Sequence, residues 1–284
     1  MIKIIKADER QKLIPKINVA LFGPSGVGKT TLARTLDPKT TLFVDLEAGT
    51  LAIQDWPGDV IDVRRTAQEY GKYPWEIARA LAVYIGGHDP SDVSGSYSKP
   101  VYDAVAKAFE SIDLNKYETI FIDSITVAGR DCFKWSQVQP EAMSEKTGKP
   151  DTRGAYGLLG REMIRWLTHL QHSSKSVIMV GILDGEKDDL NRLTWNPQIE
   201  GSKTARELPG IFDQVMTLQN FKAEDGSMYR AICCHQQNPW GYPAKDRSGR
   251  LDLLEPPDLK ALMKKIREGK RLDTKLVTTI PTQN

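Results

Sequence analysis

Nine consecutive residues near the start of the chain restrict its possible folds more than any other feature. They read GPSGVGKTT and fit the pattern G-x-x-x-x-G-K-[ST], which is typical of a loop that wraps nucleotide phosphates. Glycines allow the tight turn, and the backbone N–H groups then point inward at one anion. The predicted phosphate loop consists of Gly23, Pro24, Ser25, Gly26, Val27, Gly28, Lys29, Thr30 and Thr31.

The segments on either side of this loop have the pattern that such a loop requires. Residues 17–22 form an apolar run typical of a buried strand, and residues 31–36 are typical of the first turns of a helix. The positive end of that helix would add to the attraction for an anion. We expect Lys29 to reach the β- and γ-phosphates and the Thr30 hydroxyl to bind Mg²⁺. A glycine turn with an incidental lysine is the alternative, and this context argues against it.

Composition is that of a soluble globular protein. The 284 residues are 40% apolar and 27% charged, with a net charge of +2, so no overall field indicates a polyanion partner. There is no run of 18 apolar residues and no signal-peptide core at the N-terminus. We therefore expect a cytoplasmic protein that does not associate with membranes. Three cysteines without a C-x-x-C pair predict neither a disulfide framework nor a zinc site.

Apolar runs alternate with helical stretches along the first two thirds of the chain. Such continuous runs are typical of strands that are covered on both faces, as in a parallel sheet. A helical pattern over residues 157–170, between the last two runs, predicts a β-α-β crossover. The expected strands are residues 17–22, 41–45, 60–63, 119–123 and 176–183. The fold class is therefore α/β, with a mainly parallel sheet and helices on both faces.

Other segments depart from this alternation. Residues 66–116 are interpreted as a helical insertion, and residues 213–235 as an antiparallel hairpin around an Asp-Gly turn. Asp258 is a plausible N-cap of a short basic helix, and the last dozen residues are expected to be disordered. We expect one nucleotide-binding domain over residues 1–255, followed by the basic helix and tail over residues 256–284.

Asp123 ends the apolar run at residues 119–123. A carboxylate at the carboxyl end of a buried strand is what a second magnesium anchor requires. We expect Asp123 to hold the ion close to Thr30, through a water molecule. The alternative is an aspartate that only caps the turn after its strand.

Glu47 is the candidate for activating water. In many ATPases a glutamate directly follows the magnesium aspartate, but Ser124 occupies that position here. Glu47 lies just beyond the strand at residues 41–45, at the carboxyl edge where ligands bind such sheets. From there it can orient a water molecule in line with the γ-phosphate. The other interpretation of Glu47 is a solvated loop acid without a catalytic role.

Guanine specificity is not indicated by the sequence. Residues 115–118 have a faint likeness to the guanine-reading N-K-x-D motif, but they end in Glu118 and precede the magnesium strand. The residues after Asp123 also lack the glycine of a D-x-x-G motif. ATP and Mg²⁺ are the expected cofactors.

The order of these motifs resembles one branch of the P-loop ATPases. A phosphate loop, then D-x-E after the next strand, then a magnesium aspartate followed by serine is similar to the RecA-like ATPases. More narrowly, it resembles the phage-encoded RecA-like proteins of recombination and single-strand annealing. Residues 152–157, 207–213 and 245–251 also look like that group, so residues 1–255 would be a RecA-like ATPase domain.

The resemblance implies roles for residues outside the phosphate loop. Glu47 would be the catalytic carboxylate, and Lys245 and Arg247 would enter the nucleotide site of a neighbouring subunit. There they would act like an arginine finger, bringing positive charge to the transition state. A solvated basic loop is the other interpretation of Lys245 and Arg247. Asp184 stands where a polar sensor of the γ-phosphate is expected.

The resemblance also implies contact with single-stranded DNA. Two loops, at about residues 139–157 and 185–206, would line the axis of the assembly. Cations around an aromatic ring suit a single strand, because phosphates are neutralised while bases stack. Neighbouring acidic residues offset much of this charge, and mobile solvated loops are the alternative. The candidate contacts are Lys146, Lys149, Arg153, Lys187, Arg192, Trp195, Lys203 and Arg206.

Together these features favour an ATPase that assembles head to tail, as a ring or filament, on single-stranded DNA. It would help to pair or anneal strands in phage recombination, in the host cytoplasm, with a single-strand-binding protein as a candidate partner. Two other classes stay open. One is a phosphotransferase acting on a small molecule or nucleotide, for which Arg64, Arg65 and Arg79 would form a lid. The other is a nucleotide-gated scaffold with negligible turnover.

Overall fold

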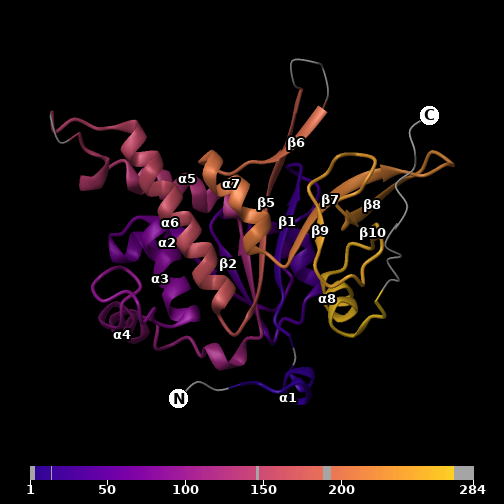
Figure 1. Cartoon of the computed structure of the whole chain (residues 1–284), viewed down its shortest axis with the longest axis horizontal. Helices are drawn as coiled ribbons and strands as arrows, with labels where there is room; N and C mark the ends of the chain where they lie inside the picture. Colours follow the sequence, from indigo (N-terminus) through magenta and orange to yellow (C-terminus); the bar gives the residue numbers. More distant parts are fainter. Residues whose placement is uncertain (1–3, 14, 145–146, 188–192, 272–284) are drawn as a thin grey trace.

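Ten strands among the described residues form a single sheet, which helices surround (Figure 1). The structure is a computed structural model, which describes residues 4–13, 15–144, 147–187 and 193–271. The main path of the sheet runs β10-β8-β7-β1-β5-β4-β2-β3, while β6 pairs with β5 and β9 pairs with β7. The strands are β1 (Asn18–Gly23), β2 (Thr41–Asp45), β3 (Asp59–Asp62), β4 (Thr119–Asp123), β5 (Ser176–Lys187), β6 (Leu193–Pro197), β7 (Gln214–Lys222), β8 (Met228–Cys233), β9 (Lys245–Asp246) and β10 (Leu254–Glu255).

The central strands are parallel and buried on both faces. Along the run β7-β1-β5-β4-β2-β3 each strand is parallel to the next, and β1, β2 and β4 are buried along their full length. Alternate side chains enter two different hydrophobic cores. Ala20 and Phe22 belong to one core, and Val19 and Leu21 belong to the other. The continuous apolar runs of the sequence are therefore strands that are covered on both faces, as expected.

The strand order brings distant motifs to one edge of the sheet. β5 separates β1, which leads into the phosphate loop, from β4, which ends at Asp123. On the neighbouring strands Asp45 lies in register with both Asp123 and Asp62. Because parallel strands end at the same edge, the phosphate loop and these aspartates meet there. This mainly parallel sheet with helices confirms the expected α/β fold class.

Helices cover both faces of the sheet. The core that contains Phe22 includes residues of α2, α3, α5, α6 and α7, whereas the core that contains Leu21 includes residues of η1 and α8. The α-helices are α1 (Ala7–Lys12), α2 (Val63–Tyr70), α3 (Pro74–Gly86), α4 (Lys99–Ala108), α5 (Ile125–Ser136), α6 (Thr152–His172), α7 (Ser202–Ile211) and α8 (Leu259–Glu268). Short 3₁₀ helices are η1 (Thr30–Thr35), η2 (Thr50–Ile53), η3 (Leu114–Lys116) and η4 (Pro140–Ala142).

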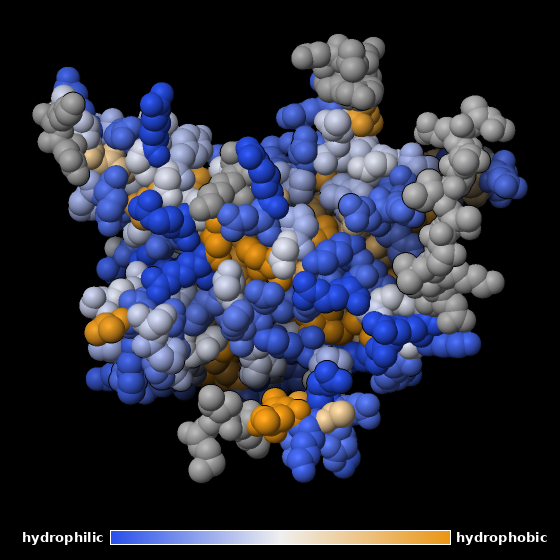
Figure 2. Space-filling view, viewed as in Figure 1, coloured by the Kyte–Doolittle hydropathy of each residue, from blue (hydrophilic) through white to orange (hydrophobic). Residues whose placement is uncertain are grey.

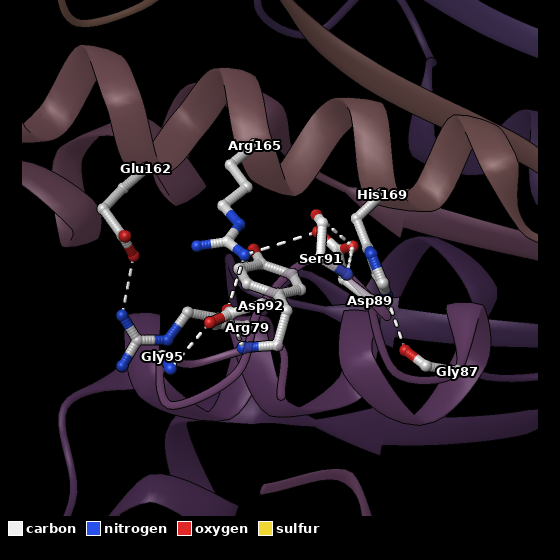
Figure 3. Close-up of polar contacts among 10 residues, drawn as sticks. Arg79, Gly87, Asp89, Ser91, Asp92, Gly95, Glu162, Arg165 and His169 are labelled. Carbon is white, nitrogen blue, oxygen red and sulfur yellow. Dashed lines mark hydrogen bonds and ion pairs between the residues drawn. The ribbon is translucent and has the colours of Figure 1, made fainter. Parts of the chain in front are cut away.

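The segment interpreted as an insertion is tied to α6 by a polar network (Figure 3). Arg79 of α3 contacts Glu162 of α6 at 2.6 Å, and both side chains are 14% exposed. Arg165 contacts Asp92 at 2.5 Å, and the His169 ring contacts the carbonyl oxygen of Gly87 at 2.9 Å. Apolar packing supports these contacts, since the α3 and α6 tryptophans meet edge to face with ring centroids 5.7 Å apart. The helical character expected for residues 66–116 is provided by α3 and α4.

Two loops expected near the DNA-binding axis contain regular structure instead. β5 runs on to Lys187 and pairs antiparallel with β6, so this hairpin projects beyond the sheet (Figure 1). The pairing positions Gly185 opposite Trp195. α6 begins at Thr152, five residues before the predicted helix, with the Asp151 carboxylate accepting the Arg153 N–H at 3.0 Å. The expectation of irregular loops was wrong for these parts of residues 139–157 and 185–206.

The predicted C-terminal hairpin and helix are present. β7 and β8 flank the Asp225-Gly226 turn, and the Asp258 side chain caps α8 by accepting the Ala261 N–H at 2.9 Å. The α8 residues Leu259, Leu262, Met263 and Ile266 are buried in the core that contains η1. The predicted tail beyond residue 271 lies outside the described residues.

The helix near the N-terminus has no buried residues. Ile4 is 83% exposed and Leu13 is 61% exposed, and Figure 2 shows hydrophobic side chains beside α1 on an otherwise mostly hydrophilic face. In the part of the chain that the structure describes, no helix combines the length and apolar character needed to cross a bilayer.

Candidate nucleotide site

The phosphate loop connects β1 to η1. Gly26 and Gly28 have φ angles of +78° and +97°, a left-handed conformation that glycine adopts without a steric penalty. Val27 between them is buried in the same core as Leu32 of η1, which anchors the loop to the sheet. The helix after the loop was predicted correctly in place, but it is a 3₁₀ helix of six residues.

Lys29 lies folded over this loop. Its Nζ atom donates hydrogen bonds to the carbonyl oxygens of Gly23 and Pro24, each at 2.9 Å. Burial lowers the pKa of the Lys29 ammonium, while the nearby carboxylates of Asp123 and Glu47 act in the opposite direction. A cation beside a loop of backbone N–H groups is an arrangement suited to phosphate oxygens.

Thr30 and Asp123 meet although 93 positions separate them in sequence. The Thr30 hydroxyl donates to Oδ2 of Asp123 at 2.5 Å, and Asp123 is only 3% exposed. Burial raises the pKa of the Asp123 carboxyl to about 6, and the carboxylates of Glu47 and Asp45 add to that rise. A cation at this point would relieve the cost of the buried charge.

The oxygen atoms at this position fit Mg²⁺. A hydroxyl and a carboxylate are hard ligands, and Mg²⁺ is commonly held by one or two such groups with water and phosphate oxygens. Within the described residues no cluster of three or more His, Cys, Asp or Glu side chains could hold a metal by itself. Thr30 and Asp123 would leave the other positions on such an ion to water and phosphate oxygens.

Glu47 lies at the same edge, directly beyond β2. The Ser124 hydroxyl donates a hydrogen bond to Oε1 of Glu47, while the Asp45 carboxylate accepts the Glu47 N–H at 2.8 Å. Ala48 follows in the left-handed region, with φ of 59°, and completes a tight turn. This turn holds an exposed carboxylate beside the Asp123 strand, and the peptide bond between Asp123 and Ser124 is cis.

Lys245 and Arg247 lie away from the phosphate loop of their own chain. Arg247 contacts Asp213 at 2.7 Å, and Lys245 donates to the carbonyl oxygens of Pro209 and Phe212. Burial lowers the pKa of Lys245. Phe212 belongs to the core on the face opposite η1. The structure therefore joins this basic pair to the end of α7 and not to the phosphate loop of its own chain.

The predicted DNA contacts are dispersed over the carboxyl-edge projections. Lys149, Arg153, Lys187 and Arg206 are exposed, and Lys203 lies in α7. Lys146 and Arg192 lie outside the described residues. Trp195 is partly buried and packs on Tyr242, with ring centroids 5.1 Å apart, so its ring is less accessible to a base than a loop residue would be.

The predicted sensor position lies in an acidic hollow. Asp184 pairs with Asn196 at the base of the β5–β6 hairpin. It lines a cavity of about 250 Å³ together with Glu186, Glu200 and Arg130. Arg130 donates to the Gln198 side chain at 2.9 Å, which joins α5 to the hairpin.

Sequence reasoning missed Arg230 of β8, which lies against the phosphate loop. A methyl group on Gly28 would be 2.4 Å from Nη1 and 3.1 Å from Cζ of Arg230. The hairpin pattern indicates that Arg230 is in a strand, and pairing places it opposite Asn220. What the sequence does not reveal is that β7 lies beside β1, which brings the hairpin to the loop.

Comparisons with known proteins add one family match. Residues 15–248 match the family model described as "AAA domain". None of the curated proteins matches the chain.

The solved structures that match the chain share little sequence with it. Flagellar accessory protein FlaH from Methanocaldococcus jannaschii is 10% identical, over 84% of this chain and 87% of that one, with a TM-score of 0.36. A prototypical type III secretion ATPase from pathogenic bacteria is 15% identical, over 72% and 51%, with a TM-score of 0.37. EscN from enteropathogenic E. coli is 16% identical, over 72% and 42%, with a TM-score of 0.36. The chain thus spans about half or less of the two secretion ATPases.

Proposed function

The chain belongs to the AAA domain family, and on that premise we propose that it binds and hydrolyses ATP. The observation that carries the proposal is the contact between Thr30 and Asp123, at 2.5 Å, beside Lys29 of the phosphate loop. Lys29, Thr30 and Asp123 are the parts that a magnesium-bound triphosphate needs, and they meet at the carboxyl edge of a buried sheet. In open α/β sheets ligands bind at this edge.

Each side chain has a distinct task in this proposal. Lys29 leaves the carbonyl oxygens of Gly23 and Pro24 and donates to the β- and γ-phosphates instead. Thr30 and Asp123 would hold Mg²⁺, which would neutralise charge on the phosphates. Glu47, whose carboxylate accepts a hydrogen bond from Ser124, orients a water molecule toward the γ-phosphate and accepts a proton from that water.

We propose that the active form is a head-to-tail assembly. Lys245 and Arg247 lie too far from their own phosphate loop to serve it, because Lys245 is in register with Val215, which pairs with Ala20. That is three residues before Gly23, or about 10 Å along the strand. Arg247 remains 53% exposed despite its bond to Asp213, so a neighbouring subunit's phosphates can still reach it.

Single-stranded DNA is the partner that we propose for this assembly. The exposed cations Lys149, Arg153, Lys187 and Arg206 lie on segments at or beyond the carboxyl edge and suit a phosphate backbone. Strand pairing or annealing in phage recombination, in the host cytoplasm and alongside a single-strand-binding protein, is the corresponding biological role. This part of the proposal depends on the resemblance of the motifs.

The three arginines expected to form the lid of a phosphotransferase contact other residues of the chain. Arg64 donates to the Leu46 carbonyl oxygen at 3.0 Å, Arg65 pairs with Glu69, and Arg79 pairs with Glu162. The three arginines that would clamp an acceptor thus have partners within the fold. A nucleotide-gated scaffold with negligible turnover is separated from an ATPase by the measurement below.

ATP hydrolysis should be measured across a protein dilution series, with and without single-stranded DNA. We expect the rate per chain to rise with protein concentration and with DNA, because a shared site requires neighbouring subunits. Glu47→Gln should retain ATP binding and slow hydrolysis at least tenfold, about 1.4 kcal/mol in barrier. Mixing Glu47→Gln with Arg247→Ala should restore some activity, since some interfaces then combine an intact base with an intact finger. A DNA-independent rate that does not change on dilution would contradict the assembly.

A further inference from the structure

Arg230 is a cation in direct contact with the loop that is built to receive an anion. Its guanidinium lies against Gly28, such that a methyl group there would be 2.4 Å from Nη1, 3.1 Å from Cζ and 3.7 Å from Nη2. These distances place one edge of the planar group against the backbone of the predicted phosphate loop. Gly28 has no side chain to keep the guanidinium away, and its φ of +97° is a conformation that favours glycine.

The position of Arg230 is fixed by the sheet. β7 pairs with β1, and Gly23 lies so close to β7 that a methyl group on it would be 2.5 Å from the Leu218 carbonyl oxygen. β8 pairs with β7, with Arg230 opposite Asn220, two residues beyond Leu218. Ile232, on the same face of β8, is buried with Val27 of the loop. Arg230 therefore projects over the loop from a strand whose base is part of the core.

The guanidinium of Arg230 is not neutralised within the fold. Across residues 4–13, 15–144, 147–187 and 193–271, Arg230 has neither an ion pair nor a hydrogen bond from its side chain, and it is exposed. Other arginines differ: Arg34, Arg165 and Arg247 each contact an aspartate. An arginine whose five N–H donors are free is suited to phosphate oxygens, which it binds in a bidentate manner.

The sheet order also fixes which phosphates Arg230 can reach. Asp123 and Glu47 lie beyond β5, on one side of β1, whereas Arg230 lies beyond β7, on the other side. Mg²⁺ and the γ-phosphate belong on the side of Asp123 and Glu47, so the phosphates nearer the nucleoside extend toward β8. We propose that Arg230 binds the α- and β-phosphates of the nucleotide and so forms the second wall of the site within the same subunit. This inference rests on the proposed nucleotide binding.

Equilibrium binding of ADP to purified full-length chain, by calorimetry, tests the proposal. Arg230→Ala should raise Kd about 10- to 100-fold, because a charge-assisted hydrogen bond to a phosphate is lost, and Arg230→Lys should retain part of the affinity. Lys222→Ala is the matched control, since Lys222 is an exposed cation on the same hairpin that lies near the turn, with Cε 3.8 Å from the position of a methyl group on Gly226. We expect its effect to be less than threefold.

Inorganic pyrophosphate separates contact with the phosphates from contact with the base. The loss in Arg230→Ala should be similar for pyrophosphate and ADP, because both carry the two phosphates. A loss for ADP alone would place the guanidinium on the base and overturn the assignment. Unchanged or tighter ADP binding by Arg230→Ala would also overturn it, the latter by showing that the guanidinium competes with the nucleotide.

The same titration distinguishes this inference from the function on which it rests. If wild-type chain and Arg230→Ala bind ADP equally well, only the assignment of Arg230 to the site is wrong. If wild-type chain binds neither ADP nor ATP and behaves like Lys29→Ala, the proposed nucleotide site is wrong, and the role of Arg230 is wrong with it. Arg230 is exposed, so the thermal unfolding midpoint of Arg230→Ala should match that of wild type and exclude a folding defect.

Discussion

Between the inserted segment and α6, charged side chains meet partners of opposite sign, whereas at the carboxyl edge of the sheet carboxylates lie beside one another. In the first region Arg79 pairs with Glu162 and Arg165 pairs with Asp92 (Figure 3). In the second, Asp123 is buried in register with Asp45 and close to Glu47. Paired buried charges hold segments together, whereas crowded like charges are costly unless a cation joins them. The first region is therefore a structural interface, and the second is where we propose that Mg²⁺ binds.

The pKa values express the same contrast. Burial tends to raise the pKa of Asp92, but the N–H groups of Tyr97 and Gly95 and the Arg165 guanidinium outweigh it and hold that pKa below its usual range. For Asp123 burial prevails, and its pKa rises to about 6. Substitutions in the two regions should therefore have opposite effects on folding and on function.

The largest effect on stability is expected from Glu162→Ala. Removing this carboxylate leaves the Arg79 guanidinium, 14% exposed, without its partner, and it also removes an acceptor for the Trp75 indole N–H at 3.4 Å. The free energy of unfolding should fall by about 3 kcal/mol, measured by urea denaturation. ADP affinity should not change. Glu69→Ala, which breaks the exposed pair with Arg65, is the control and should cost at most about 0.5 kcal/mol; equal losses would remove the distinction between the two pairs.

Lys29→Ala should have the opposite effect to Glu162→Ala: nucleotide affinity should fall while stability is retained. The ammonium is the main cation of the phosphate loop, so Kd for ATP should rise at least 100-fold, which corresponds to about 2.7 kcal/mol. Stability without nucleotide should stay the same or rise, because burial already lowers the pKa of Lys29 and so opposes its charge. Calorimetry and denaturation on the same samples measure both, with Lys99→Ala in an exposed helical pair as the control. Wild-type affinity in Lys29→Ala would contradict the assignment of the loop.

Asp123→Asn should stabilise the protein while weakening its use of Mg²⁺. The amide retains an oxygen that can accept from Thr30 but carries no buried charge, so unfolding free energy at pH 8 in magnesium-free buffer should rise by about 1–2 kcal/mol. An acid whose folded pKa is raised contributes stability below its unfolded value of 3.8 and loses it as pH rises through about 6. The advantage of Asn should therefore shrink as the pH falls from about 6 to 4. A pH-independent difference would argue against a desolvated carboxylate.

The smallest effect is expected at His169, in the region of paired charges. Burial lowers the pKa of this imidazole, which outweighs the bond to the Gly87 carbonyl and the attraction of Asp89. A base with a lowered folded pKa loses stability as pH falls through its unfolded value of 6.5, because the unfolded chain then binds the proton more readily. His169→Gln, which keeps a donor for Gly87, should flatten stability between pH 7.5 and 5.5. An equally steep decline in the variant would assign this pH dependence to other groups.

Local patterns in the sequence were enough to predict the central strands and the phosphate loop. Continuous apolar runs such as residues 119–123 have few alternatives to a buried strand, and the glycines of the loop need positive φ angles that the structure contains. Because parallel strands end at the same edge, Asp123 and Thr30 were expected to be neighbours, and they are.

Non-local features were harder to infer. The alternation of residues 193–197 is that of a strand, but its partner is the extension of β5, where the sequence predicts a loop from about residue 185. α7 contains Pro209, which conceals a helix because proline lacks the N–H that continues one. The sequence predicts Arg230 in a hairpin, but its position beside the phosphate loop depends on the pairing of β7 with β1. Strand order depends on packing across the whole sheet, and single segments do not encode it.

The pairing of β1 with β7 means that a nucleotide-binding signature near the N-terminus is physically supported from about 200 residues away. A shortened gene product that ended before Gln214 would still display every recognisable motif up to Asp123. It would nevertheless lack the backbone on which Gly23 rests and the guanidinium beside Gly28. A truncated chain whose boundaries follow the motifs alone would therefore keep the phosphate loop but lose the strands that pack against it.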